Sequence, residues 1–147
     1  MATARQMYER VQNLDIIDLV GQSMLEEKEP IVALLVEQQQ AEHVNGAGKA
    51  LKPYSPYYRL RKQRMGKSGD VDYDLTGAMH SEMNLTVSNG EYEINSPSTT
   101  DDGELKSYYL KKRDGDKSFS LTPENKEKIL PIINAPLVSK INTELGI

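Results

Sequence analysis

The sequence predicts an α+β fold, with N-terminal helices, a small antiparallel sheet built on a β-hairpin, and C-terminal helices. Apolar residues recur at three- and four-residue steps near both ends of the chain, which is typical of amphipathic helices. Between them, two short alternating runs flank Asn89-Gly90, which is typical of a hairpin. A length of 147 residues favours one domain over 1–147, with a helical region 1–48 and an α+β body 49–147.

The first two helices are predicted over Thr3–Leu25 and Pro30–Val44. Gly21 is expected to loosen or end the first helix early. Pro30 is expected to be the first residue of the second helix, because proline has no N–H and its φ is already helical. The glycine-rich run Asn45–Gly48 should end that helix.

The middle of the chain begins with two prolines, Pro53 and Pro56, that should hold their neighbours extended. Tyr57–Met65 can then form one or two helical turns, and Arg64 can share one side of them with Tyr57 and Leu60. A flexible loop is expected to follow at Gly66–Gly69.

The hairpin is predicted over Leu85–Ile94, after a short helical or turn segment at Ala78–Met83. Asn89-Gly90 supplies the two positive φ angles of a type I′ turn. Ser96–Gly103 consists of turn-forming residues and should be an exposed loop.

The C-terminal part should contain a short helix over Glu104–Lys112 and an extended stretch at Phe119–Leu121. Thr122 is then a strong N-cap for the last helical region, because a proline and an acid follow it. Pro131 and Pro136 should kink or split that region.

Composition excludes several kinds of protein chemistry. The chain has no cysteine, which rules out disulfides and thiolate sites. No secretory signal or membrane-length apolar run is visible, so a soluble protein of a reducing compartment with no membrane contact is expected. Tyrosine supplies eight of the nine aromatic residues, which favours rings buried at an interface with another chain.

No motif in the sequence indicates catalysis, a metal site or a cofactor site. His43 and His80 lack partners at ligating spacing, and Asn45–Lys49 lacks the features of a phosphate-binding loop. The run Asp70–Asp74 resembles the start of a calcium loop, but Ser81 stands where the closing glutamate is needed. We expect no enzyme activity and no cofactor. A small hydrolase with carboxylates at Asp70–Asp74 is the weakest alternative.

The segment Lys49–Lys67 is the one stretch whose composition indicates a partner. No acid occurs between His43 and Gly69, although the whole chain has a net charge of −4. The cations could pair with acids of a neighbouring subunit, or bind nucleic acid with the tyrosines stacking on bases. The negative net charge favours the protein partner. The candidate partner-binding residues here are Tyr54, Tyr57, Tyr58, Arg59, Arg61, Lys62, Arg64 and Lys67.

The order of three short motifs resembles the bacteriophage tail-completion, or virion morphogenesis, proteins of the head–tail neck. Tyr54-Ser55-Pro56 with Lys62 is similar to the first motif of that family, and Leu75–Met79 to its second. The third runs from Arg113 through Phe119 to Asn125. The chain departs from the family pattern in an insertion at residues 115–117, in Met79 where the family has leucine, and in its long N-terminal helices.

This resemblance implies a structural virion component without catalysis, at the neck or the tail top. Such a protein assembles in the host cytoplasm into a ring, of about six or twelve copies, and joins tail to head. Its partners would be other neck, tail and portal proteins, with possible contact to packaged DNA. The second motif adds Thr76 and Gly77 to the candidate contact residues, and the loops Gly66–Asp74 and Ser96–Gly103 are expected to touch neighbouring subunits. The alternative is a nucleic-acid-binding module that uses Lys49–Lys67.

Overall fold

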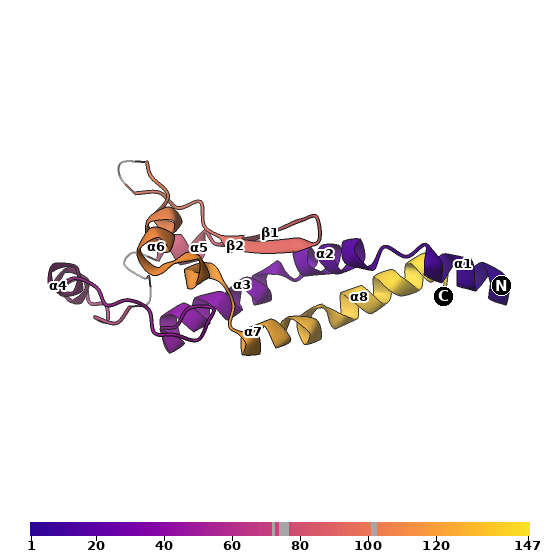
Figure 1. The fold of residues 1–147 in the computed structure, drawn as a ribbon, viewed down its shortest axis with the longest axis horizontal. Helices are drawn as coiled ribbons and strands as arrows, with labels where there is room; N and C mark the ends of the chain where they lie inside the picture. Colours follow the sequence, from indigo (N-terminus) through magenta and orange to yellow (C-terminus); the bar gives the residue numbers. More distant parts are fainter. Residues whose placement is uncertain (72, 74–76, 101–102) are drawn as a thin grey trace.

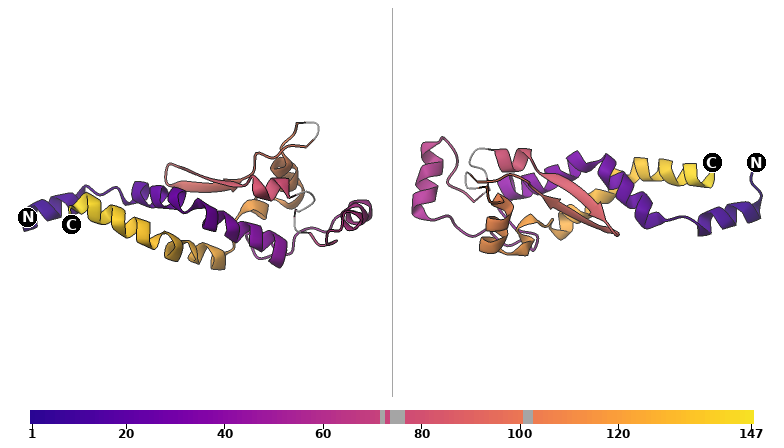
Figure 2. Two further views of the ribbon diagram at one scale, coloured as in Figure 1. Left: turned by 180° about the vertical axis from the view of Figure 1, so that it is seen from behind. Right: turned by 90° about the horizontal axis from the view of Figure 1, so that it is seen from above.

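The computed structural model describes residues 1–71, 73, 77–100 and 103–147. It confirms the α+β fold: helices precede and follow a two-stranded antiparallel sheet along the chain. Figure 1 shows an elongated molecule in which α2 and α3 lie along one side and α8 runs back beside them. The hairpin lies over α2 and α3, both termini lie at one end, and α4 lies at the other (Figures 1 and 2).

The predicted first helix is in fact two helices, α1 (Ala4–Gln12) and α2 (Ile16–Glu26). The break is local, because the Asp15 carboxylate accepts a hydrogen bond from the backbone N–H of Asp18 and so caps a new helix. Gly21, which we expected to loosen or end the helix, does not end it, because α2 continues to Glu26. Gly21 is buried inside α2, and a Cβ there would lie 3.0 Å from a methyl of Val87. The glycine therefore allows the hairpin to approach α2 closely.

The helix α3 (Lys28–Glu37) begins two residues before Pro30, contrary to the prediction. Pro30 lies in the first turn, where a missing N–H costs little because the carbonyl four residues earlier lies outside the helix. A short π-helix, η1 (Gln38–Glu42), continues α3 and ends at His43, whose φ is 55°. The glycine-rich run Asn45–Gly48 after it is a turn closed by the bridge between Val44 and Ala50. The helical region therefore ends before this run, as predicted.

The hairpin agrees closely with the prediction. Strand β1 (Asn84–Ser88) pairs with β2 (Glu91–Asn95), and Asn89 and Gly90 have φ angles of 51° and 79°. The short α5 (Ala78–Ser81) precedes it. The following loop is less exposed than predicted, because Ser96 and Ser98 are buried and the Ser96 hydroxyl donates to the Met79 carbonyl.

The C-terminal part contains α6 (Lys106–Asp114), the 3-10 helix η2 (Asp116–Phe119), α7 (Pro123–Glu127) and α8 (Ile129–Leu145). Thr122 caps α7 as predicted. Phe119 ends η2 and is not extended as we expected, whereas Ser120 after it is extended. Neither late proline splits a helix, since α8 contains both Pro131 and Pro136. The helical region is instead interrupted at Lys128, between α7 and α8.

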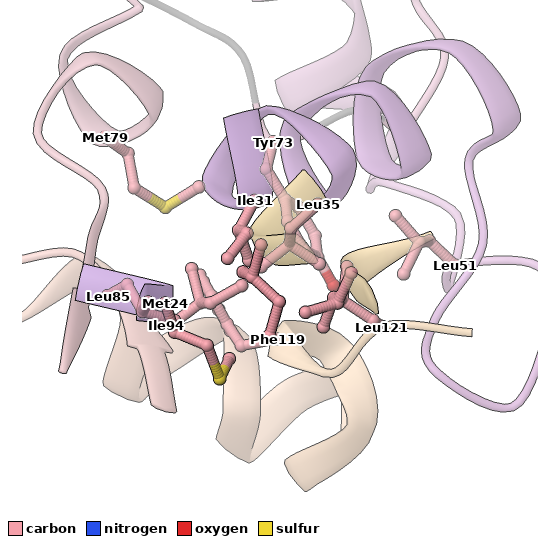
Figure 3. Packing of buried hydrophobic residues seen from close by; sticks show 12 residues of the cluster. Met24, Ile31, Leu35, Leu51, Tyr73, Met79, Leu85, Ile94, Phe119 and Leu121 are labelled. Atoms are coloured by element: carbon pink, nitrogen blue, oxygen red, sulfur yellow. The ribbon is translucent and has the colours of Figure 1, made fainter. Parts of the chain in front are cut away.

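The hydrophobic core lies where the hairpin, α3 and the start of α8 meet (Figure 3). Ile31 and Leu35 of α3 are fully buried, and Leu85 and Ile94 oppose each other across the hairpin. The buried cluster comprises Met24, Ile31, Leu35, Leu51, Tyr73, Met79, Leu85, Ile94, Phe119, Leu121, Ile129 and Ile133.

A buried amide joins the start of η1 to the segment that begins α7. Gln38 is fully buried; its Nε2 donates to the Ser120 carbonyl at 2.9 Å. Its Oε1 accepts from the Thr122 N–H at 2.9 Å and from Asn125 Nδ2 at 3.0 Å. One side chain therefore satisfies the groups at the start of α7, and replacing it would leave several buried polar groups without partners.

We expect Gln38→Met to lower the free energy of unfolding by about 2–4 kcal/mol, since the apolar side chain fills the space but orphans these groups. Urea unfolding followed by circular dichroism would measure the change. Gln22→Met, at an exposed position of α2, is the control and should change stability by less than about 0.5 kcal/mol. Equal effects of the two substitutions would contradict the assignment.

Candidate interaction surface

The predicted partner-binding segment folds as α4 (Pro56–Arg64), which projects from the rest of the molecule (Figures 1 and 2). The Ser55 hydroxyl accepts from the Tyr58 N–H at 3.3 Å and caps the helix, with Pro56 as its first residue. Its last turn carries three basic residues, which lie favourably at the negative end of the helix dipole. The helix contains no acidic residue.

The inner face of α4 is held by Lys62, which we expected to bind a partner. Its side chain is instead fully buried, with Nζ donating to the Asp70 carbonyl at 3.0 Å and lying 5.2 Å from the centre of the Tyr54 ring. A buried ammonium needs such contacts, because transfer out of water is costly without them. Lys62 therefore anchors the helix within its own chain and is not available as a surface cation.

Arg113 of α6 anchors the entry to α4 from a second direction. Its guanidinium lies 5.0 Å from the centre of the Tyr54 ring and donates to the carbonyls of Lys52 and Pro53, the latter at 2.5 Å. The Tyr54 and Tyr58 rings contact each other with centroids 4.7 Å apart. No sequence pattern indicates this role for Arg113, because it lies about sixty residues further along the chain than the carbonyls that it contacts.

Tyr73 connects this anchor to the core. Its backbone N–H donates to the Tyr54 hydroxyl at 3.0 Å, and its own hydroxyl donates to Asp114 Oδ2 at 2.7 Å. Burial, together with the Asp114 carboxylate, raises the pKa of Tyr73 well above its usual value. A cavity of about 450 Å³ lies beside these groups, lined by Tyr54, Tyr58, Tyr73, Tyr109 and Arg113 among others.

The outer face of α4 consists of Tyr57, Leu60, Arg61 and Arg64, which fall three, four and seven residues apart and so share one side of the helix. The Tyr57 side chain is 79% exposed and Leu60 is 46% exposed, and both arginines are exposed. Neither arginine forms an ion pair with an acid in the described part of the chain. We call these four residues the outer face.

The remaining predicted residues lie away from the outer face. Arg59 lies against Gly69, and Lys67 follows the helix and donates its backbone N–H to the Lys62 carbonyl. Gly77 caps α5 with a φ of 82°, so its place in the sequence reflects a turn that favours glycine. Thr76 lies outside the described residues.

Both histidines contact polar groups of their own chain. Gln39 donates to the Ser118 carbonyl, which leaves its Oε1 3.0 Å from His80 Nε2, so this nitrogen carries the proton. His43 contacts the Val71 carbonyl at 3.1 Å. Within the described residues, no three His, Asp or Glu side chains are grouped to hold a metal ion. Asp72 and Asp74 of the predicted carboxylate run lie outside them.

Comparisons of the chain with known protein families, with curated proteins and with solved structures find no match. None of the described helices has the length and apolar character needed to cross a membrane.

Arg113→Met should loosen the attachment of α4 while leaving the core intact, because the carbonyls of Lys52 and Pro53 lose their donor. We expect trypsin to cleave after Arg59, Arg61 or Arg64 about tenfold faster, as for a loss of roughly 1.4 kcal/mol in the free energy of local opening. Lys112→Met, on an exposed position of the same helix, is the matched control. Unchanged cleavage in Arg113→Met would show that the anchor does not restrain α4.

Tyr73 should make the protein sensitive to alkaline pH. Its folded-state pKa exceeds the unfolded value of about 10, so the unfolded chain loses the phenolic proton first as pH rises. The stability contributed by the neutral phenol is therefore complete below about pH 10 and is lost as pH rises above it. Unfolding free energies measured between about pH 8 and 11 should fall less steeply for Tyr73→Phe than for wild type.

The comparison of wild type with Tyr73→Phe separates the effect of Tyr73 from the effects of the other tyrosines. Burial also raises the pKa of Tyr92, but Tyr92 is present in both proteins and cancels. Tyr57→Phe removes a hydroxyl from an exposed ring and serves as the control. Parallel pH profiles for wild type and Tyr73→Phe would refute the burial of the Tyr73 phenol.

Proposed function

We propose that this protein is a structural subunit of a phage virion at the head–tail neck or tail top, where it assembles as a ring and joins tail to head. The motifs over residues 54–62, 75–79 and 113–125, which resemble those of phage neck proteins, support the assignment to a phage virion. The outer face of α4 is the observation that carries the assembly role, because it offers a contact surface that the chain itself does not cover.

The chemistry of the outer face suits a protein partner. Tyrosine and arginine are enriched at protein–protein interfaces, since each combines a large contact area with a polar group. Here Tyr57 and Leu60 supply apolar area beside the charges of Arg61 and Arg64. The opposite side of the helix is anchored by Lys62, so the outer face is held in a fixed direction. A fixed direction lowers the entropy cost of binding.

A second uncovered region lies at the other end of the molecule. Helix α1 buries none of its residues, and Tyr8, Val11 and Ile17 of α1 and α2 are 62%, 50% and 66% exposed. A closed ring made by head-to-tail contacts needs two different surfaces on each subunit. An elongated chain with uncovered apolar side chains at separate places supports that kind of assembly.

We expect Leu60→Glu to weaken self-association, with a dissociation constant raised about tenfold or more, because it places a carboxylate in the apolar part of the outer face. Native mass spectrometry and sedimentation velocity of the purified protein would measure the distribution of oligomers. Gln63→Ala, on the side of α4 that faces Gly69, is the control in the same helix. Wild-type protein that stays monomeric at millimolar concentration and with its partner proteins present would refute the proposal.

A nucleic-acid-binding module is the second candidate, and the absence of any acid in α4 is the observation that favours it. Arginines beside an exposed tyrosine could contact phosphates and stack on bases. The two functions predict different results in one assay. Duplex or single-strand binding whose affinity falls steeply with salt, in a protein that remains monomeric, would favour this candidate over the ring subunit.

A further inference from the structure

A groove of about 930 Å³ lies between α3 with η1 on one side and the α5–β1 segment on the other. Its lining includes Val32, Ala33 and Val36 of α3 and Met83 before β1. These side chains provide an apolar base open to solvent. A groove with such a base can receive the apolar side of a helix from another chain.

The edges of the groove are acidic. Glu29 and Glu37 of α3 and Glu82 after α5 line it, against one cation, Lys28. All three glutamates are exposed, and none forms an ion pair with a cation among the described residues. The groove therefore combines an apolar base with a net negative charge, and its glutamates form no ion pair within the described chain.

The outer face of α4 has the complementary character. Tyr57 and Leu60 are apolar and exposed, and Arg61 and Arg64 carry positive charge without an acidic partner in the described chain. Opposite charges across an interface favour the correct partner and orientation, and like charges oppose the wrong ones.

We propose that the outer face of α4 of one copy of this chain docks in the acidic groove of a second copy. This inference rests on the proposed ring function and specifies its subunit contact. The contact joins different chains, because the inner face of α4 is bound to its own body through Lys62 and Tyr54 and the helix stands apart from α3 (Figures 1 and 2). Two unlike surfaces meet in this contact, so it is heterologous and can propagate around a ring.

A charge exchange between two variants tests the contact. Groove variant E37K/E82K and helix variant R61E/R64E should each associate about tenfold or more weakly than wild type, because like charges would meet at the contact. Mixed in equal amounts, the two variants should assemble again, since each helix then finds a groove of opposite sign on the other variant. Sedimentation velocity at low and high salt would measure this for the full chain, and circular dichroism would check that each variant is folded.

The control and the alternative outcomes keep this inference distinct from the proposed function. E91K/E144K reverses two exposed acids outside the groove and should assemble like wild type. If the groove and helix variants assemble as well as wild type, the docking proposal is overturned and the ring function stands. Failure of the mixture to assemble, although each variant is folded and dissociated, also overturns the pairing of these two surfaces. A wild-type chain that never associates removes both proposals.

Discussion

The contacts around Tyr54 fix the orientation of α4 relative to the rest of the molecule, and both proposed functions depend on that orientation. The ring of Tyr54 contacts two cations from different parts of the chain, Lys62 and Arg113, while its hydroxyl accepts from the Tyr73 backbone. These contacts fix one side of a helix that otherwise projects into solvent. Because that side is fixed against the body, the opposite side of the helix, with Tyr57, Leu60 and Arg61, faces outward. Without the anchor, α4 would be a short helix with little reason to be ordered, since isolated helices of nine residues are marginal in water.

Much of the fold follows from local rules that the sequence displays. Asn89-Gly90 supplies the positive φ angles of its turn, and Thr122-Pro123 begins a helix by chemistry contained within a few residues. The apolar periodicity of Leu60 with Tyr57 likewise indicates correctly which side of α4 they share. Local capping also explains why the single helix predicted over Thr3–Leu25 was wrong. Asp15 lies inside a continuous apolar pattern but caps a new helix there. The apolar pattern alone favours one longer helix, as we predicted.

The composition of Lys49–Lys67 could not separate cations that face outward from one that faces inward. Lys62 is buried because the Tyr54 ring and the Asp70 carbonyl receive its ammonium group. Both partners lie outside α4, so the helical pattern does not indicate the contact. The same limit applies to Arg113, to Gly21 beneath Val87, and to Gln38 at the start of α7. Each is explained by a tertiary neighbour. A sequence pattern identified the segment that carries the candidate site, and tertiary packing decided which of its side chains remain available.

The division of charge in α4 also bears on the two candidate functions. A nucleic acid would use any cation along the strand, because phosphates repeat and accept contacts from many directions. A protein groove needs a few charges at fixed positions beside apolar area. One cation of α4 is buried, another lies over Gly69, and two flank Tyr57 and Leu60 on one side. This arrangement makes a compact mixed surface instead of a continuous basic track, and an acidic groove of matching character exists on the same chain. The balance of charge therefore favours contact between copies of the protein over contact with DNA.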